Sequence, residues 1–98
     1  MKKDALTKEE LLNEEQMNGK INMFAKVTIL PGETLEHHEH HGETETYYIL
    51  SGAGMYDDDG AEIPAKPGDV FFCRDGHGHG ITSTGEEPLV FMALIIRS

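Results

Sequence analysis

A run of histidine and glutamate residues near the middle of the chain has the side-chain types and the spacing of a metal site. Side chains two positions apart lie on the same face of a β-strand. If residues 34–40 form a strand, His38 and His40 therefore share one face. After Gly42, Glu45 opens a second run, so that two imidazoles and one carboxylate can converge from paired strands. The sequence predicts a metal-ligand set at this point.

Three neighbours of these residues have other possible roles. His37 and His41 point to the opposite face of the predicted strand, and we expect them to be exposed to solvent. Glu43 lies in the loop before Glu45, where strand parity is unreliable, so it is the alternative carboxylate ligand. The run also fits a histidine-rich tract with only adventitious affinity for metals.

The spacing of the run resembles the first motif of the cupin superfamily. The fixed positions of that motif correspond here to Gly32, His38, His40, Glu45 and Gly52. The resemblance implies an all-β fold, the cupin double-stranded β-helix, which is an antiparallel jelly-roll barrel. It also implies that the two histidines and the glutamate bind a metal.

A later stretch resembles the second cupin motif. Gly68, Gly76 and His79 fit its pattern, and the resemblance implies that His79 completes a set of four ligands. Two positions depart from the pattern. Arg74 stands where the family usually has proline, which leaves the turn before His79 less rigid. Ser83 stands where the family usually has asparagine, a side chain that often supports the end of the barrel.

The ligand types point to a transition metal. Imidazole binds iron, copper, nickel and zinc well, and a carboxylate also suits manganese. The predicted cofactor is one divalent transition metal (Fe, Mn, Ni, Zn or Cu), among which these ligands do not discriminate. Four protein ligands leave one or two octahedral positions open, as a catalytic site requires.

Other residues are candidates for the pocket around the metal. Tyr47 and Ile49 share the ligand face of the second run, although most inward residues of a small barrel fill the core. Tyr47 is the better candidate, because its buried hydroxyl would need a partner. His77 shares a face with His79 if one strand contains both, so it is a candidate proton shuttle and pocket residue, or a loop residue. Cys73 is typical of a small buried hydrophobe.

The elements that position these residues read as short strands. Residues 20–30 alternate between apolar and polar side chains, except that Phe24 lies on the polar face and needs a cover. Residues 57–60 predict a hairpin turn. Residues 89–96 are apolar on both faces, as in a strand covered on both sides. Roughly eight to ten short strands are expected, which favours a sandwich or barrel.

The N-terminal part of the chain is expected to contain a short helix and no strand. Residues 1–19 predict a short helix that is not a separate domain, and residues 20–98 predict a single cupin barrel domain. Thr7 and Glu10 have the spacing of a capping box at the start of the helix. Asn18 and Gly19 are typical of its end.

Composition argues against several classes of partner. The 98 residues suffice for one small domain, and 8 Lys and Arg against 18 Asp and Glu give a net charge of −10. This charge disfavours binding to nucleic acid or to anionic membranes. No apolar run approaches the length of a membrane span, and residues 1–4 lack the apolar block of a signal peptide. The single cysteine, Cys73, suits a reducing compartment, so we expect a cytoplasmic protein.

Cupins perform many functions, so moving from the fold to a reaction is analogy. The first prediction is a metalloenzyme that acts on a small oxygen-bearing organic molecule, with dioxygenase-like chemistry. One alternative is a non-catalytic module that binds or senses a small ligand through its metal. The other is a sugar isomerase, although no cation beyond the N-terminal segment except Arg74 is placed to hold a phosphate. A homodimer is expected, because strand edges, Phe24 and residues 89–96 need cover.

Overall fold

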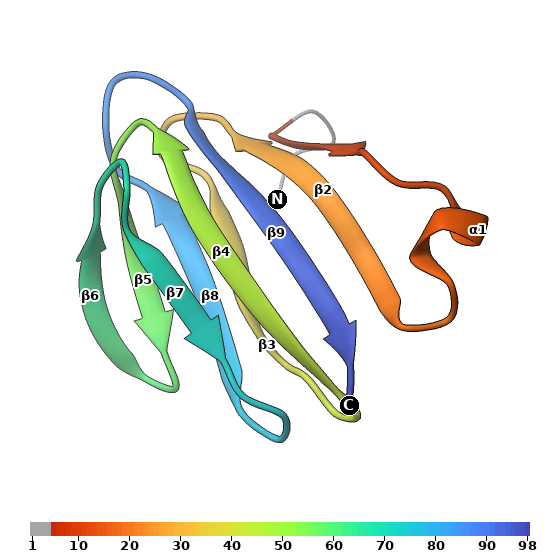
Figure 1. Cartoon of the computed structure of the whole chain (residues 1–98). Helices are drawn as coiled ribbons and strands as arrows, with labels where there is room; N and C mark the ends of the chain where they lie inside the picture. The colour runs from red at the N-terminus through yellow and green to blue at the C-terminus, as the bar shows by residue number, and fades with distance from the viewer. Residues whose placement is uncertain (1–4) are drawn as a thin grey trace.

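The computed structural model describes residues 5–98, which form two antiparallel β-sheets (Figure 1). The expectation for residues 1–4 lies outside this range. No helix among the described residues has the length and apolar character needed to cross a membrane. In chain order the elements are β1 Leu6–Glu10, α1 Glu14–Met17, β2 Ile21–Ile29, β3 Thr34–Glu39, β4 Glu43–Ser51, β5 Gly54–Asp58, β6 Ala61–Ala65, β7 Val70–Cys73, β8 Gly78–Ser83 and β9 Leu89–Arg97.

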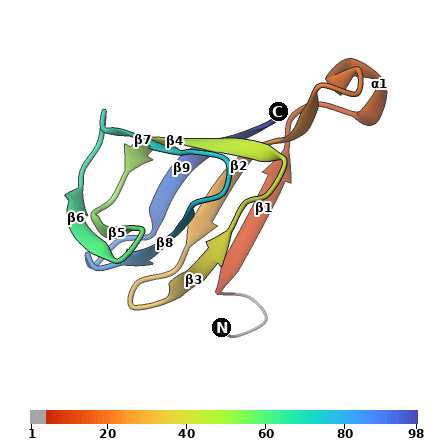
Figure 2. The same ribbon diagram turned by 90° about the horizontal axis from the view of Figure 1, so that it is seen from below.

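The two sheets lie against each other as opposing layers (Figure 2). One has five strands in the order β1-β2-β9-β4-β7, and the other has four in the order β3-β8-β5-β6. The core lies between them, where alternate residues such as Ile29, Tyr47, Tyr56, Ile81 and Phe91 are almost fully buried. The predicted all-β jelly-roll architecture is confirmed.

Two tight connections show why glycine stands at particular positions. The hairpin between β5 and β6 turns through Asp59 (φ 52°) and Gly60 (φ 100°), so that both central residues have positive φ, as predicted. Gly52, which ends the first motif, has φ 84°, and a Cβ there would lie 2.4 Å from the carbonyl oxygen of Pro88. A side chain at Gly52 would therefore collide with the backbone before β9.

A bulge in β3 determines which side chains point inward. Leu35 pairs with Ile81, whereas His38 pairs with His79, so β3 contains one extra residue between the two pairs. Leu35 and His38 consequently both face the interior, although strict alternation would place them on opposite faces. Gly80 allows the bulge, because a Cβ there would lie 2.8 Å from the carbonyl oxygen of Leu35.

The predicted N-terminal helix is wrong in position. Residues 6–10 form β1, which pairs with β2 and makes the edge of the five-stranded sheet, so Thr7 and Glu10 do not cap a helix. The helix is confined to Glu14–Met17 and is capped by Asn13, while Asn18 (φ 53°) ends it as expected. In Figure 1, α1 lies to one side of the sheets. Backbone pairing along a neighbouring strand has overridden the local capping signal.

Ser83, the second departure from the motif, is held by its backbone. Its N–H donates to Glu33 O (2.9 Å), and its carbonyl accepts from the Gly32 N–H (2.8 Å). Its fully buried hydroxyl has no hydrogen-bond partner among residues 5–98. Because a buried hydroxyl without a partner opposes folding, Ser83→Ala is expected to raise the free energy of unfolding by up to about 1 kcal/mol in urea denaturation. A loss of stability instead would show that the hydroxyl is bonded.

Candidate metal centre

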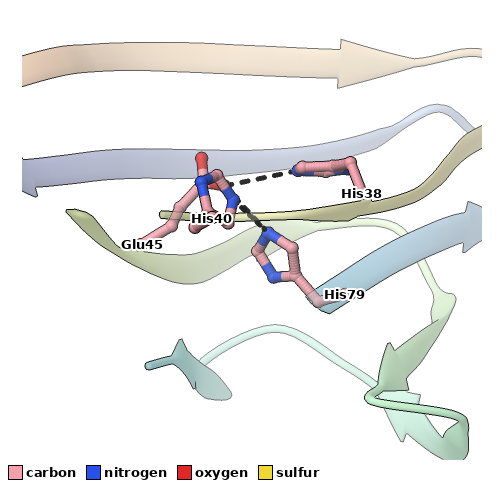
Figure 3. Close-up of side chains that lie close together, drawn as sticks. All are labelled: His38, His40, Glu45 and His79. Carbon is pink, nitrogen blue, oxygen red and sulfur yellow. Dashed lines mark hydrogen bonds and ion pairs between the residues drawn. The ribbon is translucent and has the colours of Figure 1, made fainter. Parts of the chain in front are cut away.

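Four side chains from three strands and one loop converge between the sheets (Figure 3). His38 lies on β3, His40 directly after it, Glu45 on β4 and His79 on β8. Each offers one ligand atom, and these atoms all lie within 4.8 Å of one another. The structure thus brings together the four residues that the motifs singled out.

The distances between the donor atoms suit a single cation. Nε2 of His40 lies 3.0 Å from Nε2 of His79 and 2.8 Å from Oε1 of Glu45. Nε2 of His79 lies 2.9 Å from the same carboxylate oxygen, and Nε2 of His38 lies 3.7 Å from it. Two ligand atoms about 2.1 Å from one metal, at right angles, are about 3 Å apart. The group could therefore hold one metal ion.

The other ring nitrogens of His38 and His40 are already engaged. Nδ1 of His38 lies 2.8 Å from the backbone carbonyl oxygen of Glu36, and a carbonyl can only accept, so Nδ1 carries the hydrogen. Nδ1 of His40 lies 2.5 Å from the Glu43 carboxylate, which favours the same tautomer. In the neutral rings, Nε2 then presents its lone pair to the centre, as metal ligation requires.

His79 is the most enclosed of the three imidazoles, with 1% of its surface exposed. Its Nδ1 lies 2.8 Å from the hydroxyl of Tyr56, and its Nε2 also faces the centre. Burial lowers the pKa of His79, and Glu45 opposes this only in part, so the ring favours the neutral form that binds metals. Nitrogen lone pairs and a carboxylate at such short distances repel one another unless a cation or proton lies among them. This donor chemistry fits a divalent transition metal.

Glu45 is ionised despite being buried. Burial alone would raise its pKa, but the interactions with His38 and His79 outweigh that effect and lower the pKa from 4.5 to about 2. Conversely, the interaction with Glu45 is the largest influence on His38 and raises its pKa. The centre therefore contains one permanent negative charge near neutral pH.

Glu43, the alternative carboxylate ligand, contacts the ring nitrogen of His40 that points away from the centre. Its Oε2 faces Nδ1 of His40, and its Oε1 accepts a hydrogen bond from the Asn22 amide (2.9 Å). Because such carboxylates fix the tautomer of a metal-binding imidazole, Glu43→Ala is expected to weaken metal affinity by about tenfold to hundredfold in a chelator-competition titration. Glu39→Ala is the matched control, since the exposed Glu39 side chain pairs with the exposed ring of His41. Equal affinity in both variants would contradict this role.

The remaining histidines lie outside the four-residue centre. His41 is exposed, as expected, and pairs with Glu39. His37 is also largely exposed, and its Nδ1 lies 2.6 Å from Asp57. His77 precedes β8 rather than sharing that strand with His79, so the parity that suggested a pocket position does not apply. Its Nδ1 lies 3.2 Å from Asp59, and it is not among the residues that line the cavity beside the centre.

That cavity has a volume of about 560 Å³ and borders His38, His40 and Glu45. Its apolar wall comes from β2 and β9 and consists of Met23, Val27, Phe91, Ala93 and Ile95. Lys8, Glu36 and His37 also line it. The sequence prediction missed Lys8 because the residues around it were assigned to a helix.

Tyr47 lines the cavity, whereas Ile49 belongs to the buried core cluster. The Tyr47 ring stacks on His79 with 4.8 Å between centroids, and its hydroxyl lies 3.5 Å from Nε2 of His79. Burial raises the pKa of Tyr47 well above its ordinary value, so the hydroxyl is a hydrogen-bond donor and not a base. Cys73 is a buried free thiol, as expected, and burial raises its pKa to about 11.

Two comparisons combine high coverage with substantial sequence identity. The chain is 44% identical over 86 residues to a protein of Thermotoga maritima named "oxalate-binding protein", covering 88% of this chain and 71% of the relative. It also matches the crystal structure of a predicted oxalate decarboxylase from Thermotoga maritima, with a TM-score of 0.92 and 41% identity. That match covers 95% of this chain and 81% of the other.

More distant structures share the fold alone. The cupin domain of Cnp3 from Schizosaccharomyces pombe has a TM-score of 0.86 at 17% identity, covering 98% of this chain and 67% of the other. The family model for the cupin domain matches residues 25–95, which include both motifs and all four converging side chains. The chain therefore belongs to the cupin domain family.

Proposed function

We propose that this protein binds a divalent transition metal through His38, His40, Glu45 and His79, and that the metal-loaded site takes a small bidentate oxygen-bearing acid. The observation that carries the proposal is the cluster of four donors whose atoms lie within 4.8 Å of one another beside a cavity. Oxalate is the first acid to test, because a relative with 44% identity is named for binding it. Four protein ligands leave room for two oxygen atoms on an octahedral ion.

The residues that line the cavity favour a small acid over a sugar phosphate as the ligand. The wall of the cavity is largely apolar, and a small ligand with two adjacent oxygens needs few polar contacts beyond the metal. Arg74, considered above as a phosphate ligand, is exposed and is not among the cavity-lining residues. The isomerase alternative therefore has the least support.

A second candidate is chemistry on the bound acid, including the dioxygenase-like reaction expected from the sequence. Its support is the protonated Tyr47 hydroxyl beside His79, which can donate a hydrogen bond to a ligand at the centre. The apolar wall can also limit the access of water. His77 would have to leave Asp59 to act as the proton shuttle.

Binding and turnover are tested with one protein preparation. Elemental analysis after purification without chelators identifies the metal, and calorimetry then measures oxalate binding to the metal-free and metal-loaded forms. Saturable binding of oxalate that requires metal, with the acid recovered unchanged by mass spectrometry, supports the binding function. Consumption of oxalate or of dioxygen supports the catalytic candidate. If no metal-loaded form binds oxalate or a similar small acid, the proposal is wrong.

We also propose that the protein forms a homodimer through the outer face of the five-stranded sheet. Phe24, Leu94, Thr46 and Phe72 follow one another across four adjacent strands. The next row contains Lys26, Met92, Tyr48 and Val70. Val70 and Phe72 are 61% and 55% exposed, so a wide apolar band is uncovered in one chain. Such a band is typical of an interface between subunits.

Phe72→Glu is therefore expected to convert a dimer into a monomer in light scattering at micromolar concentration, because it places a charge within the band. Ile63→Glu is the matched control, since Ile63 is an exposed apolar residue on β6 of the other sheet. It should leave the dimer intact. A wild-type protein that is monomeric under these conditions would contradict the proposed interface.

A cytoplasmic location is part of the proposal as well. The only cysteine of the chain is the buried free thiol of Cys73, which suits a reducing compartment. Cell fractionation tests this location, and recovery of the protein outside the cytoplasm would overturn it.

A further inference from the structure

We propose that Lys8 pairs with the outer oxygens of the bound acid and makes the site select dianions over monoanions. This inference rests on the proposed function, because it concerns the ligand of the same metal site. Lys8 lies on β1, the edge strand that the sequence-based prediction had assigned to a helix, and it belongs to neither cupin motif.

The register of β1 places Lys8 on the cavity side of the sheet. Lys8 pairs with Val27, and Leu6 pairs with Ile29. Val27 lines the cavity, Ile29 is fully buried, and Leu6 packs against the core. Paired residues in an antiparallel ladder point to the same face, so Lys8 is directed inward from the sheet edge. Figure 2 shows β1 at this edge, beside β2.

The ammonium group of Lys8 is available to a ligand. Among the described residues, 5–98, none forms an ion pair with it, and its side chain is exposed at the cavity. No other lysine or arginine lines that cavity among these residues.

The charges around the centre explain why a second negative charge on the ligand needs Lys8. A divalent cation together with ionised Glu45 carries one net positive charge, which a monoanion neutralises. A dianion leaves one negative charge unbalanced at an apolar wall, where electrostatic interactions are stronger than in water. Lys8 supplies the missing positive charge. Glu36 also borders the cavity and acts against dianions; its side chain is exposed like that of Lys8, so solvent screens both charges and reduces both effects.

The test compares two probes, oxalate as the dianion and glycolate as a bidentate monoanion, on Mn²⁺-loaded protein by calorimetry near neutral pH. Lys8→Met is expected to weaken oxalate binding by about fivefold, since a charge-assisted contact at an exposed position is lost. Glycolate binding should change by less than about threefold. Lys8→Arg should retain the preference for oxalate. Lys20→Met, which removes an exposed lysine outside the cavity, should behave as wild type.

Metal content measured on every variant distinguishes the possible failures. If wild type binds oxalate and Lys8→Met binds it equally well, or loses oxalate and glycolate to the same extent, the role of Lys8 is wrong while the proposed function stands. If metal-loaded wild type binds neither acid, both the proposed function and the role of Lys8 are wrong. Unchanged metal content in Lys8→Met, with a selective loss of oxalate, supports the inference.

Discussion

Replacement of His79 by alanine is expected to lower the affinity for a divalent transition metal by more than about hundredfold. His79 is central to the cluster, since its Nε2 lies 3.0 Å from Nε2 of His40 and 2.9 Å from Oε1 of Glu45. Its loss removes one of the four donors from a buried position. Chelator competition measures the affinity, and elemental analysis of the purified protein measures retained metal.

His77→Ala is the matched control for this experiment. His77 lies two positions earlier, but it contacts Asp59 and does not line the cavity, so metal affinity should equal that of wild type. Urea denaturation of the metal-free proteins shows whether either variant is destabilised, which matters because Tyr56 loses its partner when His79 is removed. A folded His79→Ala protein that binds metal as wild type does would refute the assignment of the centre.

The sequence predicted the four converging residues because motif spacing carries tertiary information. The first motif places His38 and His40 at one end of β3, and the second places His79 opposite them on β8. Strand parity alone was weaker evidence. It correctly put His38 and His40 on one face, but it gave no sign of the bulge that also turns Leu35 inward. That bulge depends on Gly80 in another strand, and no local pattern in β3 encodes it.

The N-terminal segment shows the opposite case, in which a local signal misled. Thr7 and Glu10 match a capping box, yet the surrounding residues pair with β2 and form a strand. An isolated short helix gains little stability in water, whereas an added edge strand gains backbone hydrogen bonds and packs the partly buried Leu6 against the core. The position of Lys8 at the cavity follows from this pairing. Glu36 and His37 lie at the β3 bulge and also line the cavity, so the sequence did not reveal the cavity position of any of these three residues.

The second large effect is expected on the free energy of unfolding at low pH. In metal-free protein, the folded state lowers the pKa of Glu45 from 4.5 to about 2. A carboxyl group whose pKa falls on folding stabilises the protein fully above its unfolded pKa, and this contribution disappears as the pH falls through the folded pKa. The free energy of unfolding should therefore lose about 3 kcal/mol from Glu45 alone as the pH falls from 4.5 towards 2.

Urea denaturation of metal-free wild type and Glu45→Gln over this pH range isolates the effect. Asp57, Asp69 and Asp75 also have lowered pKa values, but their contributions occur in both proteins and cancel in the difference. The wild type should thus lose about 3 kcal/mol more than Glu45→Gln, and Glu62→Gln, at an exposed position on β6, should follow the wild type. Parallel pH curves for wild type and Glu45→Gln would mean that the imidazoles do not hold the carboxylate in its charged form. The electrostatic argument for a cation at the centre would then also fail. An easily protonated Glu45 would relieve the repulsion between its carboxylate and the imidazole lone pairs without a metal.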